Sequence, residues 1–237
     1  MCGRFALTLP MDAVAGMFRA APDAGLTAAL GNLGPRWNVC PTQPVAAVVS
    51  DGGARRLTAL RWGFVPHWAK APTEGPLLIN ARAETVAEKP AFRAAARARR
   101  CLVPADGFYE WRREGRAKRP FWVHPAEGGP LGAPAALAGV WEVWRGPDGA
   151  EVAAVALVTV PAGPPLDEVH HRAPLAIRPE DRALWLGEAG PGAARLMRTA
   201  EPGAWAMHPV SPEVNSNRAD GPELIVPWTP EAPPPLI

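Results

Sequence analysis

The sequence is poor in several features, and each shortage excludes a class of protein. Only three of its 237 residues are cysteine, at positions 2, 40 and 101, and no two of them form a C-x-x-C pair. Neither a disulfide framework nor a zinc site is therefore expected, and an intracellular, cytoplasmic compartment fits. No secretory segment follows Met1. The most apolar stretch, residues 131–144, is too short to span a bilayer and contains Glu142.

Lysine and tyrosine are also scarce. Lysine occurs three times and tyrosine once, so 22 of the 25 basic residues are arginine, beside ten tryptophans. Arginine binds phosphate bidentately, and tryptophan offers flat surfaces for core packing or for stacking on bases. A GC-rich coding bias would give the same arginine excess. The net charge of +2 does not by itself indicate a nucleic-acid partner.

Turn-forming residues are abundant and divide the chain into short strand-like runs. The 30 prolines and 23 glycines favour loops over a helical bundle. Runs at 136–145 and 151–160 flank Gly146-Pro147-Asp148-Gly149, which predicts a hairpin. Further strand-like runs occupy 45–50, 57–64, 101–104, 107–112 and 121–124, and helices are predicted at 10–20, 88–100 and 179–186. We expect one α+β domain over residues 1–228 with a mostly antiparallel core and peripheral helices, followed by a proline-rich tail at 229–237.

The second residue offers unusual chemistry. An initiator methionine followed by a residue as small as Cys2 is normally removed, which would leave a free 1,2-aminothiol at the N-terminus. The α-amine has an ordinary pKa of about 7.7–8.0, so a useful fraction is unprotonated at pH 7. Amine and thiol together suit a carbonyl electrophile, because an imine can close to a five-membered thiazolidine ring. Taken alone, Cys2 is more simply the residue that follows Met1.

Three further blocks place a reactive side chain among apolar neighbours. An apolar strand is predicted to end at Asn80, with Arg82 facing the same side; Asn80 could equally cap a turn. Glu110 lies between Tyr109 and Trp111, where burial would raise the pKa of its carboxyl and suit it to acid catalysis; an exposed strand position is the equal alternative.

The third block contains the adjacent residues His170 and His171, which on a strand would point to opposite faces. No third ligand lies at a suitable spacing, so no metal and no cofactor are expected. A fourth block, residues 61–68, holds Trp62 and Trp68 and predicts an aromatic loop that packs in the core or stacks on bases.

Six blocks occur in an order that resembles the SOS-response-associated peptidase (SRAP) family. They are CGRF (2–5), WNVCPT (37–42), WGFVP (62–66), INARAET (79–85), CLVPADGFYEW (101–111) and HHRAP (170–174). The resemblance extends to about residue 227 and implies a barrel-like, β-rich domain with a cleft for single-stranded DNA. Cys40, Ala69 and Ala173 depart from the usual family residues without removing a catalytic position.

The resemblance also implies an activity and residue roles. The family forms a covalent thiazolidine crosslink with abasic sites, a lyase-like reaction that shields the lesion in the DNA damage response. Cys2 matches the nucleophile, Asn80 the residue that positions the sugar and the amine, and Glu110 and His170 the two acid/base groups. Residues that match the DNA cleft are Arg4, Asn38, Trp62, Gly63, Trp68, Arg82 and Arg172. A monomer acting on abasic single-stranded DNA, away from membranes, is expected.

Two other functions remain open at this stage. An N-terminal cysteine also serves amidohydrolases of the glutamine amidotransferase type, in which the α-amine is the base for the thiol. That interpretation leaves the blocks around Asn80, Glu110 and His170 without roles. A non-catalytic module that binds single-stranded DNA, with Cys2 incidental, is the other alternative. The peptidase activity in the family name is at most self-removal of Met1 or slow peptide-bond chemistry.

Overall fold

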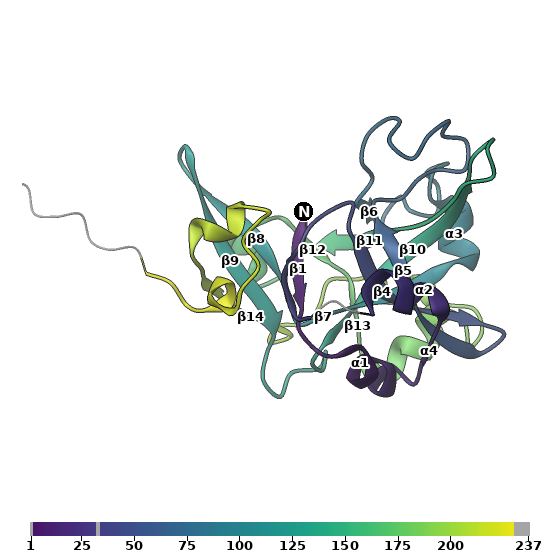
Figure 1. The fold of residues 1–237 in the computed structure, drawn as a ribbon. Helices are drawn as coiled ribbons and strands as arrows, with labels where there is room; N and C mark the ends of the chain where they lie inside the picture. The colour runs from purple at the N-terminus through teal and green to yellow at the C-terminus, as the bar shows by residue number, and fades with distance from the viewer. Residues whose placement is uncertain (1, 32–33, 230–237) are drawn as a thin grey trace, which may run out of the picture.

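The computed structural model describes residues 2–31 and 34–229, and its core is a closed five-stranded barrel (Figure 1). The barrel order is β4-β5-β11-β10-β7, and pairing of β7 with β4 closes it. All contacts around the barrel are antiparallel except that between β5 and β11. Its strands are β4 (Pro44–Asp51), β5 (Ala54–Trp62), β7 (Arg100–Ala105), β10 (Ala135–Arg145) and β11 (Glu151–Pro161).

Small and branched apolar residues fill this barrel. Val48, Leu102 and Leu137 have no exposed surface, and Leu60 and Leu157 have almost none. A five-stranded barrel is narrow, so side chains such as these fill its interior. We therefore expect functional groups at its rim or outside it.

A second sheet packs beside the barrel and contains the N-terminal strand. Its order is β14-β9-β8-β1-β3, so β1 is hydrogen-bonded on both sides. The strands are β1 (Arg4–Leu7), β3 (Arg36–Val39), β8 (Gly107–Glu114), β9 (Ala117–Pro125) and β14 (Trp205–Pro209). In Figure 1 β1 lies between β8 and the strands of the barrel. The junction of the two β structures thus contains the start of the chain.

Shorter elements complete the fold. The remaining strands are β2 (Ala21–Pro22), β6 (Asn80–Arg82), β12 (Arg172–Pro174) and β13 (Ala176–Ile177). The helices are α1 (Met11–Phe18), α2 (Ala24–Leu30), α3 (Arg93–Ala98) and α4 (Arg182–Leu186). The 3-10 turns are η1 (Leu166–Glu168), η2 (Pro179–Asp181), η3 (Ala193–Leu196), η4 (Pro212–Asn215) and η5 (Pro222–Ile225). No helix within the described ranges is both long enough and apolar enough to cross a membrane.

The structure confirms the expected α+β class, the mostly antiparallel barrel-like core and the 146–149 hairpin. Two predicted elements differ. The helix predicted at 88–100 is confined to Arg93–Ala98, because Pro90 disfavours helix before it and Arg100 already belongs to β7. The strand predicted to end at Asn80 instead begins there, since Asn80 pairs with Leu157 of β11. Most of the predicted tail, residues 230–237, lies outside the described residues.

Gly107 is required where β8 begins. A Cβ there would lie 2.4 Å from the carbonyl oxygen of Val123 and 2.6 Å from the Trp122 ring. We expect Gly107→Ala to lower the free energy of unfolding by about 1–3 kcal/mol, as overpacking does. Urea denaturation measures the change. Gly16→Ala in helix α1 is the matched control, because a Cβ added at Gly16 would have no other atom within 4 Å. A Gly107 variant as stable as the native protein would contradict this packing.

Candidate functional site

Cys2 is buried at the edge of the central strand β1. Its side chain has no exposed surface. The Cys2 thiol donates to the carbonyl oxygen of Arg4, with 3.7 Å between Sγ and the oxygen. Burial raises the pKa of the Cys2 thiol far above its ordinary value, and the nearby Glu110 carboxylate adds to this effect. The thiol is therefore protonated in this state, and it is not a preformed thiolate nucleophile.

Asn80 holds the main chain of Cys2. Its Nδ2 donates a hydrogen bond of 2.9 Å to the carbonyl oxygen of Cys2. Its Oδ1 is buried and has no hydrogen-bond donor within the described part of the chain. A buried acceptor without a partner is costly, so this amide is set to accept a hydrogen bond from a group at Cys2 or from a bound molecule. The parallel pairing of β6 with β11 fixes its position.

Glu110 lies on β8, opposite Phe121 of β9, and only 5% of its surface is exposed. The backbone N–H of Trp111 donates to its Oε1 at 3.3 Å. The Glu110 charge raises the pKa of both Cys2 and His170, which places the carboxylate close to each of them. Glu110 and His170 also line the same open hollow of about 560 Å³. The structure thus brings Cys2, Asn80, Glu110 and His170 together.

His170 precedes β12 and is oriented by the chain that follows it. His170 Nδ1 lies 3.0 Å from the backbone nitrogen and 3.3 Å from the carbonyl oxygen of Arg172, so it accepts from the N–H in one tautomer and donates to the carbonyl in the other. Burial lowers the pKa of His170, whereas the Glu110 carboxylate raises it. A neutral imidazole held in this position can accept or relay a proton near neutral pH.

The prediction that His170 and His171 face opposite sides is wrong. Their rings are stacked, with centroids 4.3 Å apart and planes 27° from parallel. Neither residue belongs to a strand, so the alternation of strand side chains does not apply to them. Charge on His171 also lowers the pKa of His170.

This stacking predicts a measurable pH effect. Replacing His171 by asparagine removes the neighbouring charge, so the pKa of His170 should rise and its neutral form should be lost at a higher pH. NMR titration of the His170 imidazole measures the shift. His171→Lys retains a positive charge and should not raise the pKa of His170. Equal upward shifts in both variants would show that the two rings are not electrostatically linked.

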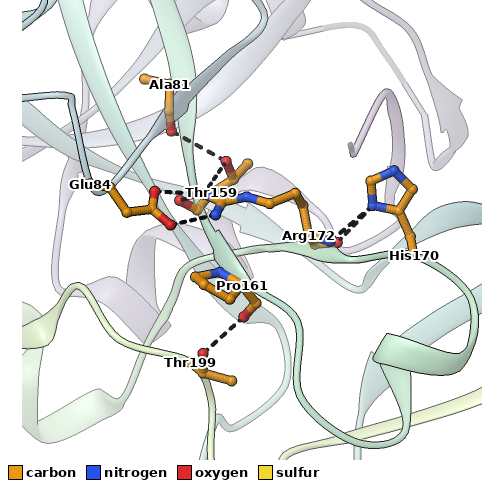
Figure 2. A network of polar contacts seen from close by, with 7 residues as sticks. All are labelled: Ala81, Glu84, Thr159, Pro161, His170, Arg172 and Thr199. Atoms are coloured by element: carbon orange, nitrogen blue, oxygen red, sulfur yellow. Dashed lines mark hydrogen bonds and ion pairs between the residues drawn. The ribbon is translucent and has the colours of Figure 1, made fainter.

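Arg172 lies beside His170 and takes part in a polar network (Figure 2). Its guanidinium donates to both carboxylate oxygens of Glu84 and to the carbonyl and hydroxyl oxygens of Thr159. The Arg172 side chain is only 8% exposed, and its hydrogen bonds lower the pKa of Glu84. Figure 2 shows the guanidinium directed toward Glu84 and Thr159, away from the ring of His170. In this arrangement Arg172 supports the turn that carries His170.

Arg4 and Asn38 are occupied by protein groups. Arg4 donates to Asn38 Oδ1 at 2.9 Å and to the carbonyl oxygen of Val214 at 2.8 Å. Asn38 is buried and donates to the carbonyl oxygens of Ser216 and Ala219. Both residues therefore hold the segment 214–219, which follows β14, against β1 and β3.

The four other predicted DNA contacts are divided between core and surface. Trp62 is fully buried, its ring packs against Phe5, and its Nε1 donates to the carbonyl oxygen of Ile79, so no face of the ring is free for a base. Gly63 adopts a φ of 137°, which a side chain would disfavour. Trp68 is 53% exposed and Arg82 is exposed, so these two are open to a bound molecule.

Sequence reasoning left several residues of the hollow unassigned. Besides Glu110 and His170 it is lined by Trp111, Arg113, Lys118 and Asn215. Trp111 Nε1 donates to Asn215 Oδ1 at 2.8 Å, which joins β8 to η4. Asn215 had no detectable signal because it is distant in sequence from every block. The positions of Arg113 and Lys118 in the hairpin 107–124 could have been found from strand register.

The family model and the similar proteins indicate the same family. The family model described as SOS response associated peptidase (SRAP) matches residues 1–217. The chain is 34% identical over 229 residues to the abasic site processing protein YoqW of Bacillus subtilis, covering 95% of this chain and 99% of that one. It is 31% identical to the abasic site processing protein YedK of Escherichia coli, over 96% of this chain and all of the relative.

A solved structure shares the fold. A protein from Bacteroides thetaiotaomicron superposes with a TM-score of 0.84 at 22% sequence identity, covering 96% of this chain and all of that one. At this identity the match concerns the fold, in which a barrel and a second sheet meet at the N-terminal strand.

Proposed function

This chain belongs to the SOS response associated peptidase (SRAP) family, and on that basis we propose that it processes abasic sites in single-stranded DNA by forming a covalent bond through Cys2. Its relatives named above are abasic site processing proteins. The contact between Asn80 and the Cys2 carbonyl, beside Glu110, is the observation that carries the proposal. This contact holds the main chain of Cys2 close to the Glu110 carboxylate.

The chemistry begins after removal of Met1. The Cys2 amine adds to the C1′ aldehyde of the ring-opened deoxyribose, and the carbinolamine loses water to give an imine. The thiol then adds to the imine carbon while its proton passes to the nitrogen, which closes a thiazolidine. The two new bonds, C–N and C–S, replace the C=O bond, whose oxygen leaves as water. Because both nucleophilic atoms belong to one residue, ring closure has a large effective-molarity advantage.

Three side chains assist these steps. Asn80 Oδ1, buried and without a donor in the described chain, accepts a hydrogen bond from the new amine. The Glu110 carboxylate takes up the proton that the amine loses on addition and passes it to the departing oxygen, and neutral His170 relays protons in the hollow. The high pKa of the thiol fits this order, since the amine attacks first and the thiol needs to lose its proton only at ring closure.

The hollow also suits an abasic nucleotide. It opens beside Glu110 and is bordered by Arg113 and Lys118, with exposed Arg82 and Trp68 elsewhere on the surface. A nucleotide without a base enters such a site at little unstacking cost. Trp68 offers a stacking face for a neighbouring base, and Arg82 a charge for the backbone.

A labelled oligonucleotide with one abasic site tests the proposal. We expect a protein–DNA band that survives denaturing electrophoresis, and no such band with an intact base or with a reduced abasic site that lacks the aldehyde. Release of ammonia from glutamine without an adduct would instead indicate an amidohydrolase. Native binding without any adduct would indicate a non-catalytic module, and either result would overturn the proposal.

A further inference from the structure

The β8–β9 hairpin sets two positive charges opposite each other. Arg113 of β8 pairs in register with Lys118 of β9, next to the turn. Side chains of directly opposed residues share one face of a sheet with Cβ atoms about 4.5–5.5 Å apart, so two like charges in these positions repel each other. Such a pair is destabilising to the hairpin alone and becomes favourable when an anion lies between the two.

The other face of the same hairpin is already neutralised. Arg112 and Arg119 are also opposite each other, but Glu114 accepts from Arg112 at 2.6 Å and forms an ion pair with Arg119 at 3.4 Å. Arg112 additionally lies over the Phe121 ring, 4.8 Å from its centroid. By contrast, Arg113 and Lys118 are exposed and make no hydrogen bond or ion pair with any residue in ranges 2–31 and 34–229.

The hollow beside the candidate site extends to this charge pair. Arg113 and Lys118 line the hollow of about 560 Å³ that also contains Glu110 and His170. Arg113 lies three residues beyond Glu110 on the same strand, which corresponds to about 10 Å at 3.3 Å per residue. The charge pair is therefore displaced from the reacting groups but belongs to the same open space.

We propose that Arg113 and Lys118 together bind one phosphodiester of the DNA strand, at a fixed distance from the abasic nucleotide. This inference rests on the function proposed above. Even at the compact duplex rise of about 3.4 Å per nucleotide, that phosphate lies within about three nucleotides of the lesion, and on one side of it only. Arginine offers a bidentate fork to the phosphate oxygens, and lysine adds a compact charge.

The first test measures reversible binding of an intact single-stranded oligonucleotide by fluorescence anisotropy at several salt concentrations. Removing both charges in Arg113→Ala/Lys118→Ala should weaken binding about tenfold at low salt. It should also reduce the slope of log K against log salt by about 0.7, the value for one phosphate on a single strand. Arg116→Ala is the control for loss of one positive charge from the same hairpin, since Arg116 lies at the exposed hairpin turn outside the hollow.

The second test locates the phosphate. Neutral methylphosphonate linkages are placed one at a time on both sides of an abasic site, and the rate of adduct formation is measured at low DNA concentration. The native protein should be slowed at one linkage within about three nucleotides, and the double variant should be insensitive at that linkage. Thermal melting of each variant verifies that it is folded.

The outcomes separate this inference from the proposed function. If adducts do not form but the salt slope changes as expected, the phosphate site survives and the covalent function fails. Adduct formation with no linkage preference, or equal effects of the double variant and Arg116→Ala, would overturn the phosphate site alone. The binding test needs no reaction, so it gives a result in either case.

Discussion

Cys2→Ala is expected to abolish the stable adduct with an abasic oligonucleotide. The variant keeps the α-amine and can still form an imine, but it lacks the Sγ atom that closes the ring. An imine hydrolyses readily, whereas a thiazolidine gains from the intramolecular position of its sulfur. After denaturing electrophoresis the yield should fall to that of a reaction without protein.

The variants of Cys2 can be distinguished chemically. With borohydride present during the reaction, Cys2→Ala and Cys2→Ser should again give an adduct, because reduction traps the imine. Cys40→Ala is the matched control and should react like the native protein, since Cys40 Sγ donates to the carbonyl oxygen of Asn38 and Cys40 does not line the hollow. A stable adduct from Cys2→Ala without reductant would remove the thiol from the mechanism.

Glu110→Gln is expected to slow adduct formation by about 10²–10⁴-fold, the usual contribution of a positioned acid/base group. Glutamine retains the size of the side chain and an oxygen that can accept from the Trp111 N–H, so β8 should remain in place. It cannot, however, exchange a proton with the carbinolamine oxygen. Single-turnover rates at saturating DNA measure the chemical step apart from binding.

The control for this prediction is Glu127→Gln, an exposed carboxylate beyond β9 that does not line the hollow. Its rate should match the native value. Because Glu110 is 5% exposed, the Gln variant also needs a denaturation curve to establish that it is folded. A folded Glu110→Gln protein with an unchanged single-turnover rate would contradict the assigned role.

The fold was predictable from sequence where patterns are local. The alternation in 136–145 and 151–160, with turn residues between them, predicted the β10–β11 hairpin with only small errors at its ends. The complete ring of the barrel was not predictable from such patterns, because it also requires β5 and β11 to pair across about 90 residues of sequence. Local propensity contains no information about that contact.

The site was predictable in its residues more than in its geometry. The blocks around Cys2, Asn80, Glu110 and His170 were identified, and the structure brings those four side chains together. The packing of Trp62 in the core could not be read from its neighbours, since aromatic residues serve both cores and surfaces. Strand alternation also failed for His171, because a turn precedes β12.

The central position of β1 also limits when the N-terminus can mature. Its partners are β3 and residues 107–109 of β8, so the sheet cannot enclose Cys2 until that part of β8 has left the ribosome. At about 5–20 residues per second, synthesis to that point takes roughly 5 to 20 s. The proposed chemistry needs a free Cys2 amine, so we expect Met1 to be removed before this sheet encloses Cys2.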